Sequence, residues 1–313
     1  MADHETPRVA VDVGGGLRLR NPVIAASGTF GYGLEFAAVT DLTALGAIVV
    51  KGLSLEPNQG HRAPRILETP AGMLNAIGLQ NIGVRAFVET KLPELRAFGT
   101  PIVANCWGHL PEEFGEVAAR LSDAEGLAAI EVNVSCPNKR EWGRIIATDL
   151  DLTREVVRLV RARCRLPLWV KLSPNVTDVA SFARVAEEEG ADAVSLINTL
   201  VGLAVDLDRR RPVLTNVTGG LSGPAIKPVA LRMVYDVARA VKIPVIGMGG
   251  IASGEDALEF LLVGARAVQV GTASFTDPRA TERIAGELSV GLRRRGCSDI
   301  AAWIGSLEGV PVR

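Results

Sequence analysis

A single cysteine follows a short apolar segment and is flanked by uncharged polar side chains, in the stretch Ile130-Glu131-Val132-Asn133-Val134-Ser135-Cys136-Pro137-Asn138. Apolar residues at every second position predict a buried strand, and Pro137 ends it because proline cannot donate to a sheet ladder. Cys136 is therefore expected on the loop beyond the strand. An isolated cysteine is usually a small buried hydrophobe. The polar groups of Asn133, Ser135 and Asn138 instead favour a pocket for a planar ligand rich in amides.

Lys171 lies near the end of another apolar run and admits two chemistries. It could form a Schiff base, as in barrel aldolases, or hold a fixed positive charge beside a flavin ring. The histidines His4, His61 and His109 do not lie at the end of a predicted strand, so Cys136 lacks the usual partner of a nucleophilic thiol. Cys136 is thus better suited to accept a proton. Proton abstraction coupled to hydride uptake by a flavin would be a dehydrogenation across a C–C bond.

The elements that must position these residues are short β-branched runs alternating with helical patterns, which is typical of βα units on a parallel sheet. Eight runs predict the α/β class and a closed (β/α)₈ TIM barrel. An open doubly wound sheet is less favoured, because no glycine fingerprint of a dinucleotide fold follows the first strand. The runs are Val23–Ala26, Ile48–Lys51, Ile102–Asn105, Ile130–Val134, Leu168–Leu172, Ala193–Ile197, Val245–Met248 and Ala267–Val270.

Between these runs, four amphipathic stretches predict helices, with Asp178 and Ser253 placed as N-caps. The helices are expected at Leu152–Arg165, Val179–Glu189, Val229–Val241 and Glu255–Val263. Two connections, Gly52 to Asn81 and Thr199 to Lys227, are too long for simple loops. Both follow strands, so both are predicted as insertions on the C-terminal face, where barrel active sites are built.

Before the first strand, a hairpin is expected from Val9–Val13 and Leu17–Leu19 around the turn Gly14-Gly15-Gly16, covering the bottom of the barrel. At the opposite end, every predicted strand finishes in polar residues or glycine. Glycine-rich turns after the seventh and eighth strands predict a phosphate site made of backbone N–H groups. The strand ends carry Ser27-Gly28, Lys51-Gly52, Asn105, Asn133 with Cys136, Lys171, Asn198-Thr199, Gly249-Gly250 and Gly271-Thr272.

The composition predicts one barrel domain over residues 1–313, with 48% hydrophobic residues for its core. The 34 Lys and Arg nearly balance the 35 Asp and Glu, which argues against nucleic-acid binding. No apolar run approaches the roughly 20 residues of a membrane span, and the N-terminus has no signal-peptide core, so a cytoplasmic protein is expected. The four cysteines lack paired spacing, which argues against disulfides, a metal site or an iron–sulfur cluster.

Several motifs together resemble the dihydroorotate dehydrogenase family, FMN enzymes of pyrimidine biosynthesis. The resemblance runs from about Val9 to Phe275 and is carried by Lys51-Gly52, Asn75-Ala76-Ile77-Gly78-Leu79-Gln80-Asn81, Asn133-Val134-Ser135-Cys136-Pro137-Asn138, Ile197-Asn198-Thr199 and Thr218-Gly219-Gly220-Leu221-Ser222-Gly223-Pro224. A cysteine base is the mark of class 1 in this family. Thr69 to Asn75 and Asn198 to Gly202 look most like the NAD-linked, two-subunit branch of that class.

The resemblance implies a role for each matching residue. Cys136 would take the C5 proton of dihydroorotate while C6 delivers hydride to N5 of FMN. The pyrimidine ring and its carboxylate would be held by Lys51, Asn75, Ile77, Gly78, Leu79, Asn133, Asn138, Asn198 and Thr199. FMN would be held by Ala26, Ser27, Lys51, Gly52, Asn105, Asn133, Lys171, Ile197, Gly223, Gly249, Gly250, Gly271 and Thr272. The resemblance also implies a homodimer within a heterotetramer, with a subunit carrying FAD and a [2Fe–2S] cluster.

Three segments differ from the family's usual pattern: Cys106-Trp107-Gly108-His109, Lys139 to Arg144, and Ala301 to Gly305. Three other functions also fit the residues. They are the uracil or thymine reduction of dihydropyrimidine dehydrogenase, which shares the barrel and the Ser-Cys-Pro core, a Schiff-base aldolase using Lys171, and a flavin-binding interaction protein without turnover. The terminal electron acceptor, whether NAD, fumarate or another, is left open by the sequence, as are the oligomeric state and the physiological direction.

Overall fold

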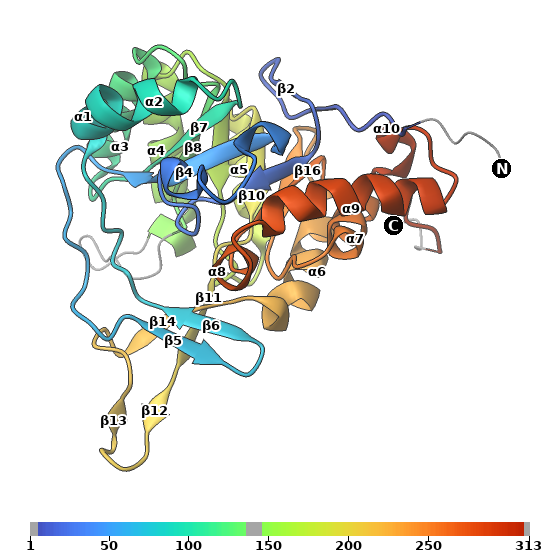
Figure 1. Ribbon diagram of the computed structural model, residues 1–313. Helices are drawn as coiled ribbons and strands as arrows, with labels where there is room; N and C mark the ends of the chain where they lie inside the picture. The colour runs from blue at the N-terminus through green and yellow to red at the C-terminus, as the bar shows by residue number, and fades with distance from the viewer. Residues whose placement is uncertain (1–5, 136–145, 310–313) are drawn as a thin grey trace.

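Eight parallel strands close into a barrel in the computed structural model, which describes residues 6–135 and 146–309 (Figure 1). The strand order around the barrel is β10-β15-β16-β3-β4-β7-β8-β9. Each predicted run forms one of these strands, so the (β/α)₈ fold is confirmed. The strands are β3 (Val23–Ala25), β4 (Ala47–Leu53), β7 (Ile102–Cys106), β8 (Ala129–Asn133), β9 (Leu168–Lys171), β10 (Ala193–Leu196), β15 (Val245–Met248) and β16 (Ala267–Val270).

Helices cover the outside of the barrel and bury one apolar face each against it (Figure 1). The long ones are α3 (Pro111–Ser122), α4 (Leu150–Arg163), α5 (Val179–Glu188), α6 (Lys227–Ala238), α7 (Gly254–Leu262) and α9 (Ala280–Arg294). The four predicted helices are confirmed as α4 to α7, with ends that differ by a few residues. Short helical segments are α1 (Val84–Ala86), α2 (Leu92–Arg96), α8 (Ala273–Thr276), α10 (Ile300–Trp303), a π-helical turn at Phe87–Lys91, and 3₁₀ turns at Leu34–Phe36, Leu42–Ala44, Ile146–Thr148 and Pro224–Ile226.

The strands are buried on both faces, because they lie between the helices and the barrel interior. All five positions of β7 and all five of β8 are buried. Apolar side chains fill most inward positions, as in other barrels of this kind. The exceptions are a few polar residues at the carboxyl half of the barrel, and these residues form the site described below.

The N-terminal hairpin covers the amino-terminal end of the barrel, as predicted. Strands β1 (Val11–Asp12) and β2 (Arg18–Leu19) pair antiparallel. A Cβ atom at Gly14 would collide with the carbonyl oxygen of Asp192, and one at Gly15 would lie 2.7 Å from Cβ of Pro167. Pro167 and Asp192 immediately precede β9 and β10. The positive φ of 90° at Gly14 lets the turn approach these strands without a side chain.

The two long insertions pair with each other, which the sequence did not predict. The first contributes β5 (Ile66–Thr69) and β6 (Gly72–Asn75), and the second contributes β11 (Leu200–Leu203) and β14 (Thr218–Ser222). Together they form a four-stranded antiparallel sheet in the order β11-β14-β6-β5, next to the carboxyl end of the barrel (Figure 1). A second hairpin, β12 (Val205–Asp206) with β13 (Arg211–Pro212), extends from this sheet away from the barrel (Figure 1).

The start of α7 shows why the capping residues could be predicted. Ser253 Oγ accepts a hydrogen bond from the backbone N–H of Asp256, and the Asp256 side chain accepts one from the backbone N–H of Ser253. This reciprocal pair satisfies two N–H groups that the helix itself leaves unpaired. Asp178 caps α5 by accepting from the N–H groups of Ala180 and Ser181. Both predicted N-caps are confirmed.

We expect Ser253→Ala to lower the free energy of unfolding by about 1 kcal/mol, because the side-chain acceptor is lost. The measurement is the denaturant midpoint at constant slope. Ser253→Thr is the matched control, since it keeps the hydroxyl, and it should unfold close to the parent. An alanine variant with the parent's midpoint would show that the cap contributes nothing.

Candidate active site

The carboxyl ends of the barrel strands bring the predicted residues to one end of the molecule. Some occupy the last positions of a strand: Asn105 in β7, Asn133 in β8 and Lys171 in β9 are paired with a neighbouring strand, whereas Lys51 and Gly52 of β4 lie where the pairing register with β7 shifts. Others follow a strand directly: Ala26 and Ser27 after β3, Ile197, Asn198 and Thr199 after β10, Gly249 and Gly250 after β15, and Gly271 and Thr272 after β16. The predicted residues Cys136 and Asn138 lie outside the described residues.

Lys171 is a buried cation at this end of the barrel. It is 5% exposed, and its Nζ donates to Ser27 Oγ at 3.3 Å. Nζ also lies 4.0 Å from Oε1 of Glu131. Since β3 and β9 are not neighbours in the sheet, the contact between Ser27 and Lys171 crosses the barrel interior. The two predicted residues therefore face the same space from opposite sides.

Glu131 is the centre of a buried polar network that sequence analysis did not identify. Its carboxylate is fully buried and accepts hydrogen bonds from Asn105 Nδ2 at 2.7 Å, Ser195 Oγ at 2.8 Å and Gln269 Nε2 at 2.7 Å. The signal that could have revealed it was a charged residue in the middle of an otherwise apolar strand. With Lys171, the network joins β7, β8, β9, β10 and β16 across the interior.

A chain of hydrogen bonds joins two of the predicted amides at the end of β8. Ser135 Oγ donates to Asn133 Oδ1 at 2.6 Å, and Asn198 Nδ2 donates to Ser135 Oγ at 2.8 Å. Ser135 is fully buried and Asn133 nearly so. The structure thus brings Asn133 and Asn198 together through Ser135, the residue immediately before Cys136.

Asn175 holds the loop that carries Asn198 and Thr199, and sequence analysis missed it. Its Nδ2 donates to the Thr199 carbonyl at 3.0 Å, and its Oδ1 accepts from the Val201 N–H at 2.9 Å. The Thr199 N–H donates to Asn198 Oδ1 at 2.9 Å. Asn175 follows β9 and is not part of any predicted motif, so no local pattern pointed to it.

The predicted residues of the first insertion approach the site through the four-stranded sheet. Asn75 Nδ2 donates to the Gly220 carbonyl at 3.3 Å. A Cβ atom at Gly220 would collide with Oγ1 of Thr199, so these residues are in close contact. Glycine at position 220 therefore allows Asn75 and Thr199, from the two insertions, to lie on either side of one strand.

The backbone of Ile77, Gly78 and Leu79 is held by one backbone and one side-chain hydrogen bond that sequence analysis did not identify. His61 donates its backbone N–H to the Ile77 carbonyl at 2.9 Å, and Asn58 Nδ2 donates to the Gly78 carbonyl at 3.0 Å. Leu79 has a positive φ of 58°, a conformation that L residues rarely adopt. These contacts fix the segment in one shape.

Lys51 lies between the barrel and the first insertion. Burial lowers the pKa of its ammonium, and the nearby charge of Arg65 lowers that pKa further, while Glu35 acts in the opposite direction. Two cations held near each other attract an anion, because binding one relieves their repulsion. Arg65 itself was not predicted from the sequence, and it is oriented by Gln80 Oε1 at 2.7 Å.

The glycines predicted to bind the cofactor lie next to one another. A Cβ atom at Gly250 would lie 2.9 Å from the Gly223 carbonyl oxygen, and one at Gly249 would lie 3.4 Å from Cγ1 of Ile197. A Cβ atom at Gly271 would lie 3.7 Å from Cβ of Ala26. In the same region, Oγ1 of Thr272 donates to Ser222 Oγ at 2.8 Å. Backbone is therefore exposed where a phosphate could approach it.

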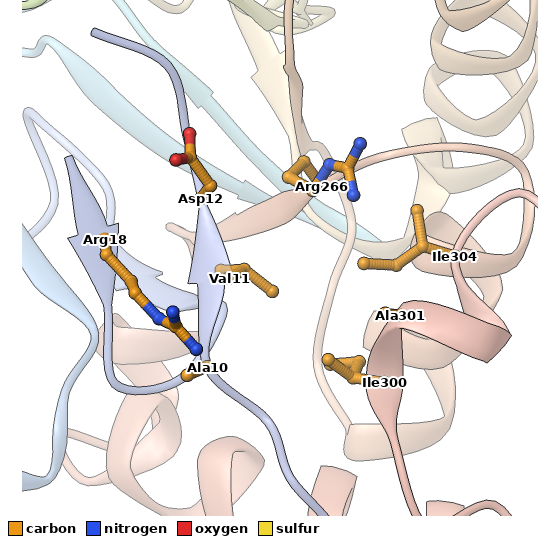
Figure 2. A pocket seen from close by; sticks show the side chains of 8 residues that line it. All are labelled: Ala10, Val11, Asp12, Arg18, Arg266, Ile300, Ala301 and Ile304. Atoms are coloured by element: carbon orange, nitrogen blue, oxygen red, sulfur yellow. The ribbon is translucent and has the colours of Figure 1, made fainter. Parts of the chain in front are cut away.

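A small cavity of about 190 Å³ lies at the other end of the barrel, beside the N-terminal hairpin (Figure 2). Its walls come from β1, β2 and α10, and Figure 2 shows the charged side chains of Asp12, Arg18 and Arg266 around it. All three of these residues are exposed. None of the predicted site residues contributes to this cavity, so it is separate from the candidate active site.

Comparison with known proteins shows which family the chain belongs to. The family described as "Dihydroorotate dehydrogenase" matches residues 10–292. Proteins named "Dihydroorotate dehydrogenase B (NAD(+)), catalytic subunit" are 59% identical in Citrifermentans bemidjiense and 56% identical in Geobacter sulfurreducens, each over 97% of this chain and 99% of the relative. The chain belongs to the dihydroorotate dehydrogenase family. The resemblance stated from the motifs is thereby confirmed over nearly the full length.

The residues at the carboxyl end of the barrel in this chain fit a flavin. Asn105 Oδ1 is buried and has no hydrogen-bond partner among the residues described. A Cβ atom at Gly52 would lie 2.7 Å from that oxygen, so a side chain at position 52 would crowd it. The Lys171 ammonium carries three N–H donors, and one of them meets Ser27. This donor and acceptor set suits a planar ring edge of alternating N–H and C=O groups.

Residues 6–135 and 146–309, which the structure describes, contain no group of three His, Cys, Asp or Glu residues that could hold a metal ion. The same residues contain no helix long and apolar enough to cross a membrane. Cys106 and Cys164 are buried free thiols, and burial raises the pKa of both.

We expect Asn175→Ala to loosen the loop from Asn198 to Leu203, because both of its side-chain hydrogen bonds to that loop are lost. Amide hydrogen exchange of the peptide containing Val201 should become about tenfold faster. Asn216→Ala is the matched control, since Asn216 is also half-buried but bonds the Thr218 carbonyl. Equal protection of this peptide in the parent and in Asn175→Ala would contradict the assigned role.

Proposed function

We propose that this chain is the catalytic subunit of an FMN-dependent dihydroorotate dehydrogenase that oxidises dihydroorotate to orotate in pyrimidine biosynthesis. The observation that carries the proposal is the hydrogen-bonded chain of Asn133, Ser135 and Asn198, in which Ser135 directly precedes Cys136 in the sequence and Asn133 is paired with the buried cation Lys171 on the neighbouring strand. Neutral amides complement a pyrimidine ring, and a fixed cation complements a flavin that gains charge on reduction. The names of relatives at 55–59% identity support the same activity.

In this proposal the chain's own residues bind, orient and deprotonate the substrate. Cys136 takes the C5 proton as general base. Asn75, Asn133, Asn138, Asn198 and Thr199 hold the ring, with backbone contacts from Ile77, Gly78 and Leu79. FMN, when bound, supplies the acceptor for the C6 hydride. Lys171, Asn105, Ser27, Ala26, Gly52 and Ile197 would hold its ring, and Gly223, Gly249, Gly250, Gly271 and Thr272 its phosphate end.

Electrostatics at Lys51 favours dihydroorotate over the substrates of the alternative functions. Lys51 and Arg65 together attract an anion, and dihydroorotate has a carboxylate whereas uracil and thymine do not. A Schiff-base role for Lys171 is disfavoured, because an imine requires an uncharged amine. The Lys171 head group instead lies beside a carboxylate and donates to Ser27, as an ammonium does.

We expect Cys136→Ala to retain FMN and orotate but to lose flavin reduction by dihydroorotate roughly 10²–10⁴-fold, because the general base is removed. Anaerobic stopped-flow bleaching of the flavin measures this rate. Cys136→Ser should keep part of the rate and gain at high pH. Cys297→Ala is the control: its thiol is half-buried near the C-terminus and bonds the Asp299 carbonyl, so its rate should match the parent. Rapid reduction in Cys136→Ala would eliminate the assignment.

Electrons are proposed to leave through a second subunit carrying FAD and a [2Fe–2S] cluster, docked on a dimer of this barrel. This chain has neither a dinucleotide fingerprint nor a cysteine cluster of its own. We expect the isolated chain to reduce dyes with dihydroorotate but not NAD, and to gain NAD reduction when that subunit is added. NAD reduction by the chain alone, or efficient turnover with fumarate and no partner, would overturn this part of the proposal.

A further inference from the structure

Glu131 is a buried carboxylate for which the proposed chemistry gives no role. It is fully buried in β8, and its three hydrogen-bond partners, Asn105, Ser195 and Gln269, come from β7, β10 and β16. Removing a carboxylate from water is costly unless donors and a counter-charge replace the water. An apolar side chain at this position would fill the barrel without that cost. The position of the charge therefore requires an explanation other than packing.

In each of its contacts with the described residues, the Glu131 side chain acts as a hydrogen-bond acceptor or as an anion. Amide N–H₂ groups can only donate, so Asn105 and Gln269 both require a lone pair on the Glu131 oxygens. The Lys171 ammonium lies 4.0 Å from Oε1. This arrangement suits the ionised carboxylate, which accepts at both oxygens. Glu131 thus places a negative charge next to the cation at the proposed flavin site.

The same carboxylate also determines which way the Asn105 amide points. Because Nδ2 of Asn105 is held by Glu131 at 2.7 Å, its Oδ1 must point elsewhere. That oxygen is the buried atom without a partner among the described residues, and it lies beside Gly52. Glu131 therefore affects two residues of the site. It holds the Asn105 amide by a hydrogen bond, and it places a negative charge near the Lys171 ammonium.

We infer that Glu131 is a positioning residue that holds the Asn105 amide in one orientation and, by its charge beside Lys171, lowers the reduction potential of the bound FMN. The inference rests on the proposed flavin site. The negative charge offsets part of the field of Lys171, so the electrons added to the flavin are stabilised less than they would be by an unopposed cation. A lower reduction potential would make the reduced flavin a better electron donor.

The test is the reduction potential of FMN in the purified holoprotein, measured by equilibration with a reference dye. Glu131→Gln removes the charge with little change in shape. We expect the ratio of reduced to oxidised FMN at a fixed dye potential to rise on the order of tenfold. Glu131→Asp keeps the charge and should stay near the parent. Ser195→Ala is the matched control, because it removes one hydrogen bond from the same carboxylate without changing any charge.

Lys171→Met provides a second background in case Glu131→Gln alone leaves Lys171 uncompensated and unfolds the barrel. In that background, adding Glu131→Gln removes the remaining charge of the pair. The FMN of the double variant should then have a higher reduction potential than the FMN of Lys171→Met. Equal potentials for parent and Glu131→Gln, or for the two Lys171→Met proteins, would overturn the inference, as would an equally large rise in Ser195→Ala. A parent protein that binds no FMN would instead overturn the proposed function.

Discussion

Closure of the barrel is the constraint on which the site depends. In a closed parallel barrel, all carboxyl ends of the strands face the same way, and inward side chains from different strands meet in the interior. The register pairs Asn105 with Glu131, and Ser195 with Lys171. These residues are far apart in the sequence, yet the ladder fixes their relative heights within the barrel. The polar network therefore results from strand register and does not depend on loop conformation.

Burying the charges of this network costs free energy, and this cost limits which substitutions the barrel tolerates. A buried ion pair contributes little to stability relative to apolar packing, whereas removing one partner leaves the other charge uncompensated. Lys171 and Glu131 are 5% and 0% exposed. Ser195, Gln269 and Asn105 solvate the carboxylate in place of water. The three neutral partners thus take the place of water around the carboxylate, and of the three only Asn105 was predicted as a site residue from the sequence.

The parts of the structure that could be predicted are those set by local patterns. Strand runs, amphipathic helices and the caps at Asp178 and Ser253 depend on neighbouring residues, and the eight barrel strands, the helices α4 to α7 and both caps were found from the sequence. The sheet of β5, β6, β11 and β14 was missed, because its pairing joins segments from two separate insertions. Glu131 and Asn175 were missed for a similar reason. Their partners come from other strands and loops, and a single sequence carries no sign of those contacts.

The two halves of the candidate site have different supports. The residues proposed to hold the flavin ring lie in the last positions of barrel strands or directly after them. Asn75 is the last residue of β6 in the insertion sheet, and Gly220 of this sheet contacts Thr199 in the loop after β10. That contact has no room for a side chain. The substrate half therefore depends on how the insertion sheet lies against the barrel loop as well as on the register of the barrel strands.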